Sequence, residues 1–353
     1  MDPENILKPL RVRHFSQKKQ RWIHVKKSIL THIGQWAAGA GSSSSSGSSN
    51  PPSPTTLNPS SPVENNAKGP FPSSIQVLTW NIDFMQPNGK ERTTVALNHI
   101  QCDVFRCQDG RRPDPCVILL QEIHPESLPA ILEHDWVRNH FNMIPTKEDH
   151  WPQRAYGNVT MVSRTIPVLS AQLLAFGNSI MGRHVLLVDL RLGAQKANDR
   201  EALSDKSDMP VTLRIANVHL ESLPYGASTR PVQLAATATM LREKGIHAGI
   251  VGGDMNAISP GDGHIHEDAG LLDAWLDGDE DEKGFTWGYQ PPSEFAAGRL
   301  DKIFYTSMAH CTVEVPQQVG VGLKTAHRQW VTDHYAPLAI KGIFEVAVPD
   351  SDD

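Results

Sequence analysis

The fold of this chain is indicated by one stretch, Ile250-Val251-Gly252-Gly253-Asp254-Met255-Asn256, in which a short apolar run ends in polar residues. The run has the length and composition of a buried β-strand. Its two glycines would let the backbone turn sharply, and Asp254 and Asn256 would face the same side if the segment stays extended. Asp254 could then orient or deprotonate a water. A turn chosen only for its permissive backbone angles is the competing interpretation.

Five other apolar runs have the same form, with a residue able to hold a metal or move a proton at or near one end. They are Val77-Leu78-Thr79-Trp80-Asn81, Val117-Ile118-Leu119-Leu120-Gln121-Glu122, Ile215-Ala216-Asn217-Val218-His219, Leu300-Asp301-Lys302-Ile303-Phe304-Tyr305 and Trp330-Val331-Thr332-Asp333-His334. Strands bring distant parts of a chain together, so these ends are expected to converge on one edge of a packed sheet.

Helix-like stretches separate these strand-like runs. Apolar residues recur at helical spacing over 93–102, 126–133 and 231–244. The alternation predicts an α/β or α+β layered fold. Polar residues 194–210 separate two further strand-like runs and predict a long exposed hairpin loop.

The composition is that of an intracellular globular protein. The 353 residues can bury a large core, preferably in one domain. No stretch approaches the roughly 20 uninterrupted apolar residues of a membrane span. The formal net charge of -6 argues against general affinity for polyanions, so any nucleic-acid contact must be local. Three of the 4 cysteines, Cys102, Cys107 and Cys116, cluster without a standard zinc spacing, and buried thiols are the simpler interpretation.

Three regions are predicted along the chain: a basic N-terminal arm over 1–37, a disordered Ser/Pro/Gly-rich linker over 38–72 and a catalytic domain over 75–348. The arm carries no acidic residue between Lys8 and Lys27. The basic composition indicates a targeting signal or a nucleic-acid tether, and a solvated tail is the alternative. We expect the protein in the nucleus or cytoplasm, with mitochondrial targeting by the arm as the other option.

A histidine near the C-terminal end is the second candidate for chemistry. His334 follows Thr332 and Asp333. A histidine with a carboxylate partner is fixed in tautomer and more basic, which suits it to donate to a phosphoryl oxygen. Asp301 is a candidate partner, because a carboxylate at the centre of a strand needs a compensating interaction. A purely structural Asp-His pair is the alternative.

Oxygen ligands for a metal come from other strand ends. Glu122 ends the most apolar strand and is a natural anchor for Mg²⁺, which prefers few protein oxygens and several waters. Asn81 and Asp83 offer further hard oxygen ligands. His219 would lie on the same side as Asn217, although a buried structural histidine is the usual explanation for one such residue.

The order of these motifs carries a family resemblance. They are Trp-Asn-Ile-Asp at 80–83, Leu-Gln-Glu at 120–122, Asn-x-His-Leu-Glu-Ser at 217–222, Gly-Asp-x-Asn at 253–256, Arg-Leu-Asp-Lys-Ile at 299–303 and Thr-Asp-His at 332–334. In this order they resemble the endonuclease/exonuclease/phosphatase (DNase I-like) superfamily over about residues 75–345. The residues at 79–83, 219–222 and 285–287 most resemble those of the tyrosyl-DNA phosphodiesterase 2 branch.

The resemblance implies a fold, a cofactor and a set of residues. The fold is a four-layer sandwich of two packed mixed β-sheets flanked by helices, and the activity is Mg²⁺-dependent phosphoester hydrolysis, with Mn²⁺ as the substitute metal. The implied metal-binding set is Glu122, Asn81, Asp83 and Asp333. The implied catalytic set is Asp254, Asn256, His219, His334 and Asp301. These groups would supply positioning, charge neutralisation and an in-line water, as phosphoryl transfer requires.

The implied roles are specific. Asp254 would activate the attacking water with Asn256 beside it, His219 and His334 would hold the phosphate oxygens, and Asp301 would orient His334. Two departures from the branch affect specificity. Ile258 stands where the branch has a substrate-contacting Arg, and residues 223–227 separate the His-Leu-Glu-Ser motif from Arg230.

The expected substrate is a nucleic-acid end, such as a 5′ end of DNA bearing an adduct in need of repair. Phosphate contacts are expected from Arg183, His184, Arg230, Arg299, Lys302 and Lys324, and base stacking from Trp287 or Tyr289. The alternatives are a phosphatase or phospholipase-like enzyme acting on inositol phosphates or other small phosphoesters, and a non-catalytic binding module. The residues do not predict an oligomeric state.

Overall fold

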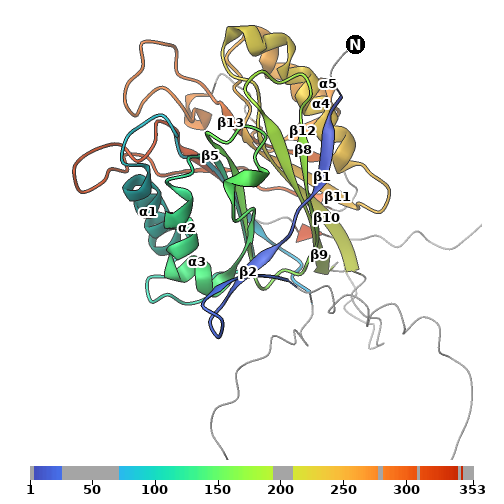
Figure 1. The fold of residues 1–353 in the computed structure, drawn as a ribbon. Coiled ribbons are helices and arrows are strands. Elements are labelled where there is room, and N and C mark those ends of the chain that lie inside the picture. Colours follow the sequence, from blue (N-terminus) through green and yellow to red (C-terminus); the bar gives the residue numbers. More distant parts are fainter. Residues whose placement is uncertain are drawn as a thin grey trace, which may run out of the picture. The chain divides into compact units, whose positions relative to one another are not determined.

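The computed structural model describes residues 4–25, 71–193, 210–276, 281–307, 311–340 and 343–344. Within them, two mixed β-sheets pack face to face and helices cover their outer faces (Figure 1). The predicted sandwich of two mixed sheets flanked by helices is confirmed. No helix in these ranges combines the length and apolar character that crossing a membrane requires.

The first sheet has seven strands in the order β1-β8-β9-β10-β11-β13-β12. They are β1 (Ile6–Pro9), β8 (Val168–Ala175), β9 (His184–Gly193), β10 (Pro210–His219), β11 (Ala248–Asp254), β13 (Asp301–Thr306) and β12 (Leu271–Asp273). Only the pair β10 and β11 is parallel among these neighbours. The antiparallel pairing of β9 with β10 agrees with the predicted hairpin, whose loop over 194–209 lies outside the described residues.

The second sheet has eight strands in the order β15-β16-β4-β5-β7-β6-β2-β3. They are β15 (Gln317–Val319), β16 (Ala336–Ile340), β4 (Gln76–Asn81), β5 (Cys116–Ile123), β7 (Gly157–Ser163), β6 (Phe141–Ile144), β2 (Arg13–Ser16) and β3 (Arg21–His24). Its parallel pair is β4 and β5. A separate two-stranded ribbon joins β14 (Cys311–Thr312) to β17 (Ile343–Phe344).

The helices form the two outer layers. They are α1 (Gly89–His99), which continues as a π-helical turn over Ile100–Val104, α2 (Leu128–Glu133), α3 (Asp135–His140), α4 (Arg230–Leu241) and α5 (Ile265–Asp268). Short 3₁₀ turns lie at Glu148–His150, Pro224–Ser228, Pro260–His264 and Glu282–Gly284. In Figure 1, α1, α2 and α3 cover the second sheet, whereas α4 and α5 cover the first.

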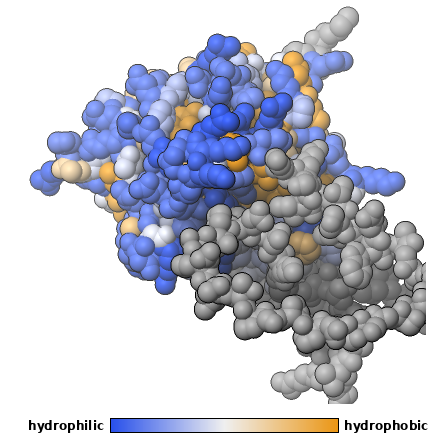
Figure 2. Space-filling model, turned by 60° about the horizontal axis from the view of Figure 1, so that its bottom comes forward, coloured by the Kyte–Doolittle hydropathy of each residue, from blue (hydrophilic) through white to orange (hydrophobic). Residues whose placement is uncertain are grey.

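Three apolar clusters separate the four layers. Alternate residues of a strand face opposite sides of its sheet. In β4, Leu78 and Trp80 therefore pack against α1 and α2, whereas Val77 packs between the sheets. In β11, Ile250 faces the space between the sheets and Val251 faces α4. The face drawn in Figure 2 has mainly hydrophilic residues with small apolar areas, as expected when most large apolar side chains are inside.

The N-terminal residues do not form the expected separate arm. Residues 4–25 belong to the same compact unit as the sheets, where β1 pairs with β8 and β2 pairs with β6. Because β1 and β3 are edge strands, their basic residues suit the position: charge on an exposed edge discourages pairing with other chains. The partner strands are distant in sequence, so the local composition did not reveal them. The predicted linker over 38–72 lies outside the described residues up to residue 70.

The paired glycines of β11 also differ from expectation. Gly252 and Gly253 lie within the strand and form no turn. A Cβ on Gly252 would approach Leu119 of the other sheet to 2.9 Å, and one on Gly253 would lie 1.8 Å from the Val218 carbonyl oxygen. The glycines are therefore required by close packing on both sides of the strand that ends at Asp254.

Candidate active site

The structure brings the polar strand ends together at one edge of the paired sheets. Within the first sheet, His219, Asp254 and Asp301 lie side by side on β10, β11 and β13. The Asn81 amide at the end of β4 donates to Asp254 Oδ2 across the sheets at 2.9 Å. Residues more than 170 positions apart in the chain are thus in direct contact, because their strands end at the same edge.

Asp254 lies at the centre of this edge and is 2% exposed. Its Oδ1 accepts the backbone N–H of Asn256 at 2.8 Å. His219 Nε2 is 3.5 Å and His334 Nε2 is 3.9 Å from Asp254 Oδ2. Burial raises the pKa of Asp254 to about 6; His334 opposes this rise and Asp301 adds to it. A carboxylate with a pKa near neutrality is suited to accept a proton from water.

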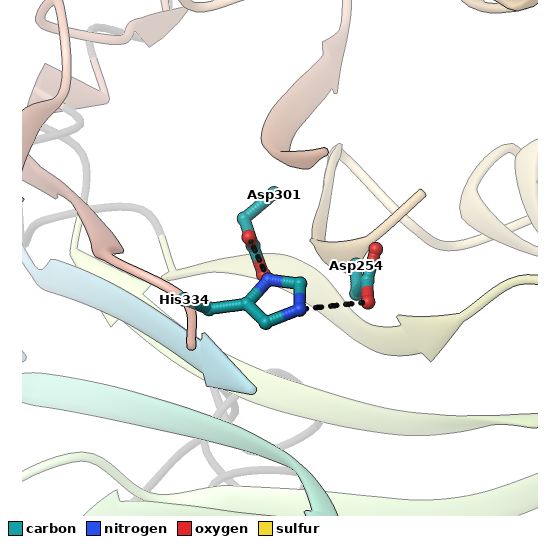
Figure 3. A group of neighbouring side chains, drawn as sticks. All are labelled: Asp254, Asp301 and His334. Carbon is teal, nitrogen blue, oxygen red and sulfur yellow. Dashed lines mark hydrogen bonds and ion pairs between the residues drawn. The ribbon is translucent and has the colours of Figure 1, made fainter. Parts of the chain in front are cut away.

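His334 is held between two carboxylates (Figure 3). Its Nδ1 is 2.6 Å from Asp301 Oδ2, and its Nε2 faces Asp254. Burial disfavours the imidazolium, but the carboxylates of Asp301, Asp333 and Asp254 outweigh it and hold the pKa of His334 well above its ordinary value. His334 is therefore a charged hydrogen-bond donor at this edge.

Three further carboxylates gather beside this cluster. Glu122 Oε2 accepts the Phe84 N–H at 3.0 Å, and burial raises the Glu122 pKa. The pKa of Asp83 rises to about 6 because of burial and the negative charges of Asp333 and Glu122. Asp333 Oδ2 accepts the Trp287 indole N–H at 2.8 Å. The repulsion that Asp333 and Glu122 exert on Asp83 is what a hard divalent cation bound among these carboxylates would relieve.

A second grouping competes for a metal. Among the described residues, Asp254, Asp301 and His334 are the group of His, Cys, Asp or Glu residues whose ligand atoms all lie within 4.8 Å of one another. Asp301 and His334 already satisfy each other through the 2.6 Å contact. Glu122, Asp83 and Asp333 are the alternative set; their ligand atoms do not all lie within 4.8 Å of one another, but all three are carboxylates without such a contact to a histidine Nδ1. Asn81 contributes less directly, because its Oδ1 accepts the Asp83 N–H and its amide nitrogen is bonded to Asp254.

Four of the eight non-glycine residues with positive φ in the described part of the chain lie at or near this edge. Positive φ angles occur at Asp83 (56°), Glu122 (56°), Asn256 (48°) and Leu223 (67°), none of which is glycine. Such conformations are unfavourable for side-chain-bearing residues and persist where surrounding contacts determine them. Glu122 lies at the end of β5, and Asp83, Asn256 and Leu223 lie two to four residues after the ends of β4, β11 and β10.

His219 has a partner that the sequence did not indicate. Arg183 donates to His219 Nδ1 at 2.6 Å and to Ser222 at 2.5 Å, while its guanidinium lies 5.3 Å from the Tyr156 ring centroid. Burial and then the Arg183 charge lower the His219 pKa well below its ordinary value, so the ring is neutral. With Nδ1 accepting, the proton is on Nε2, which is buried without a hydrogen-bond partner.

Glu221 fixes the turn that carries Arg183. Its carboxylate accepts from the Ser179 hydroxyl at 2.7 Å and from the backbone N–H groups of Ile180 and Met181. Gln233 of α4 donates to the same carboxylate at 3.0 Å. The His-Leu-Glu-Ser motif thus supplies one residue at the edge and two residues that position Arg183. The motif sequence alone could not show this, because Arg183 and the turn over residues 179–181 lie just before β9, far from the motif in the chain.

A polar link behind the edge joins the two sheets. Gln121 Nε2 donates to Asn217 Oδ1 at 2.8 Å and to the Thr79 hydroxyl at 2.9 Å. The Asn217 amide in turn donates to the Leu120 carbonyl. Both amides are fully buried and donate across the sheet interface, whereas Gln121 Oε1 has no hydrogen-bond partner. The donated bonds fix the relative register of the strands that end near Glu122 and His219.

Three of the six basic residues expected to contact phosphate are buried in the fold. Arg230, Arg299 and Lys302 are 0%, 6% and 1% exposed, and Arg230 pairs with Asp262. Arg299 pairs with Asp273. Lys324 is exposed, with its ammonium 3.8 Å from the Trp330 ring centroid. The side chains were predicted from charge alone, whereas the fold buries them with polar partners.

A family model described as the Endonuclease/Exonuclease/phosphatase family matches residues 78–334. The chain belongs to this family. Its members are hydrolases that act on phosphoester bonds, and their fold generally uses a divalent metal. A search of curated protein sequences found no match.

Solved structures with this fold include members of the family from animals. The truncated Caenorhabditis elegans TDP2 is 21% identical, with a TM-score of 0.57, 76% of this chain covered and 97% of that chain. D. rerio TDP2 complexed with single strand DNA product is 18% identical, with a TM-score of 0.57 and coverage of 76% and 99%. The human Nocturnin catalytic domain with bound sulfate anion is 16% identical, with a TM-score of 0.50 and coverage of 77% and 96%. At these identities the likeness shows the fold.

Proposed function

We propose that this family member is a Mg²⁺-dependent phosphodiesterase that hydrolyses phosphoester bonds at nucleic-acid ends, including 5′ ends that carry adducts. The observation that carries the proposal is the geometry around Asp254. It is a buried carboxylate with a pKa near neutrality, held by Asn81 and Asn256 and flanked by two histidine donors. Beside it lie carboxylates suited to a divalent cation.

In the proposed mechanism, Asp254 orients the attacking water and accepts its proton. The charged His334, supported by Asp301, donates a hydrogen bond to a phosphoryl oxygen, and the neutral His219 donates from Nε2. These donors are held in place before the substrate arrives, which is how such groups stabilise developing charge. Asn81 and Asn256 keep Asp254 in one orientation.

Glu122, Asp83 and Asp333 would hold the metal, and Mn²⁺ could replace Mg²⁺ there. A bound divalent cation would neutralise charge on the phosphoryl group. Asn81 would contribute mainly by linking the Asp83 backbone to the Asp254 carboxylate.

Two observations support a nucleic-acid substrate. One solved relative of the same fold, D. rerio TDP2, is described as complexed with single strand DNA product. In this chain, Tyr289 is 43% exposed and Trp287 contacts Asp333, so aromatic rings border the edge, where bases could stack.

A phospholipase-like activity on an amphiphilic phosphoester is the second candidate. Loops that adjoin the catalytic edge expose large apolar side chains, among them Met85, Ile180 and Phe295, which are 73%, 76% and 77% exposed. Ile258, which stands where the related branch has an Arg, is also 43% exposed. An apolar border of this kind favours a substrate with an apolar portion near the phosphate.

A substrate panel tests these assignments. The full chain with Mg²⁺ is assayed on a 5′-phosphotyrosyl oligonucleotide, an unmodified oligonucleotide, an inositol polyphosphate and sphingomyelin vesicles. We expect turnover of an oligonucleotide, abolished in Asp254→Asn. Cleavage of only the inositol or lipid substrate would overturn the nucleic-acid assignment. No turnover of any substrate with Mg²⁺ or Mn²⁺ would favour a non-catalytic binding module.

A further inference from the structure

Two arginines outside the proposed catalytic and metal-binding sets are buried almost completely. Arg92 near the start of α1 is 1% exposed and Arg230 at the start of α4 is 0% exposed. A guanidinium has five N–H donors in a rigid planar fork. Each of these two guanidinium groups makes five hydrogen bonds, and one arginine belongs to each helical layer.

Arg92 joins two loops on the metal side of the edge. It donates to the carbonyls of Ile82 at 2.7 Å and Asp83 at 2.6 Å, in the loop after β4. It also donates to the Val331 carbonyl at 2.7 Å, two residues before Asp333. The remaining donors reach Gln86 and Pro87. All five acceptors are backbone oxygens, so Arg92 fixes the path of both loops.

Arg230 joins the two loops on the other side. Its Nε and Nη2 atoms donate to the Asp262 carboxylate at 2.9 and 2.7 Å, and Nη2 also donates to the Ser259 hydroxyl at 3.0 Å. Its Nη1 donates to the carbonyls of Glu221 and Leu223, both at 3.0 Å. The loop that follows His219 is thus tied to the loop that follows Asp254.

We infer that Arg92 and Arg230 are positioning residues for the reaction, each holding two loops of the catalytic edge in one arrangement. The inference rests on the proposed phosphoesterase function. Arg92 binds the segments that carry Asp83 and Asp333, so its loss should weaken metal binding. Arg230 binds the loops that follow His219 and Asp254, so its loss should lower kcat. Neither guanidinium binds a side chain of the proposed catalytic or metal-binding sets.

A third buried arginine provides a matched control. Arg214 on β10 is 4% exposed and binds Asp189 at 2.6 and 3.0 Å, with further bonds to Met240 and Glu243. It lies five residues before His219 on the same strand, which is roughly 16 Å at the usual rise per residue. Arg214 has the same kind of buried pairing but contacts no loop of the edge.

Lysine substitution separates positioning from simple stabilisation. Lysine keeps the positive charge but cannot reproduce the planar five-donor geometry. The full-length variants Arg92→Lys, Arg230→Lys and Arg214→Lys are compared at a temperature where thermal melts show each to be folded. Turnover of an oligonucleotide substrate is measured, together with Mg²⁺ binding by calorimetry without substrate.

We expect all three variants to melt at lower temperatures. Arg214→Lys should keep wild-type kcat, KM and Mg²⁺ affinity. Arg230→Lys should lower kcat on the order of 100-fold with unchanged Mg²⁺ affinity, because small misplacements of reacting groups have effects of that size. Arg92→Lys should weaken Mg²⁺ binding by about 10-fold or more, as expected for residues that orient metal ligands.

Wild-type kcat in folded Arg230→Lys and wild-type Mg²⁺ affinity in folded Arg92→Lys would overturn the inference. If Arg230→Lys does not fold, Asp262→Asn against its control Asp189→Asn makes the same comparison, and equal kcat in both would contradict positioning by Arg230. If Arg92→Lys does not fold, Arg92→Gln is compared with Arg214→Gln, and unchanged Mg²⁺ affinity would contradict positioning by Arg92. An inactive wild type would instead contradict the proposed function. The Mg²⁺ affinities would still test whether Arg92 positions the metal-binding loops.

Discussion

The two sides of the catalytic edge differ in how their charges are balanced. On the side of Asp254, each charge has a protein partner: His334 lies against Asp301, and Asn81 and Asn256 hydrogen-bond the carboxylate. On the side of Glu122, the carboxylates of Asp333 and Glu122 raise the Asp83 pKa by repulsion. The nearby positive charges are Arg92, Arg183, which acts on Glu122, and His334, which lies 3.7 Å from Asp333. The first side pairs its charges mainly within the protein, whereas the second gathers three carboxylates whose repulsion a divalent cation would relieve.

The largest expected effect comes from removing the proposed base. Asp254→Asn keeps the shape of the side chain but removes its capacity to accept a proton, so kcat should fall on the order of 10³ to 10⁴-fold. Mg²⁺ affinity should change little, because the metal lies on the other side of the edge. Steady-state kinetics and calorimetry measure both. A variant with near wild-type kcat would show that the base has been assigned to the wrong side.

A smaller loss is expected from Asp301→Asn. Asp301 is a main cause of the raised His334 pKa, so the variant should have a His334 pKa closer to its ordinary value. Because the protonated form is the proposed donor, activity should be lost at a lower pH on the alkaline side, and kcat at neutral pH should fall about 100-fold. The kcat profile against pH tests this. An alkaline limb unchanged from wild type would contradict it.

Glu122→Gln should act on the metal side alone. Replacing the carboxylate by an amide should weaken Mg²⁺ binding about 10-fold to 100-fold, and excess Mg²⁺ should recover part of the activity. Calorimetry in the absence of substrate gives the affinity. Asp103→Asn, an exposed carboxylate paired with His99, serves as a control that should bind Mg²⁺ normally. Equal affinities in the two variants would exclude Glu122 as a ligand.

The smallest effect concerns stability and pH. The folded-state pKa values of Asp254 and Asp83 are about 6, above the ordinary value of 3.8. Their contribution to stability is therefore complete below about pH 4 and is lost as pH rises through about 6, on the order of 1–3 kcal/mol for each group. Without metal, urea midpoints should fall over this range, and less steeply in Asp83→Asn. Identical slopes in the two proteins would contradict this.

Much of the architecture was predictable from local patterns. The short apolar run at 77–81 predicts the strand β4, and the helix-like stretches correspond to α1, α2 and α4. Failures occurred where long-range contacts override composition. The basic N-terminal residues enter the edges of two sheets. Arg230 was predicted to bind phosphate, but Asp262 and three other acceptors allow its burial.

Local information in the chain was enough to identify the strands, the chemical groups at their ends and the family to which their order belongs. Short apolar runs and residue identity are properties of short segments, so they can be recognised without coordinates. Only the tertiary structure decided which groups meet, that His219 is neutral beside Arg183, and that Arg92 and Arg230 tie loops together. Burial, pairing and pKa depend on neighbours that are distant in sequence, and folding alone brings those neighbours together.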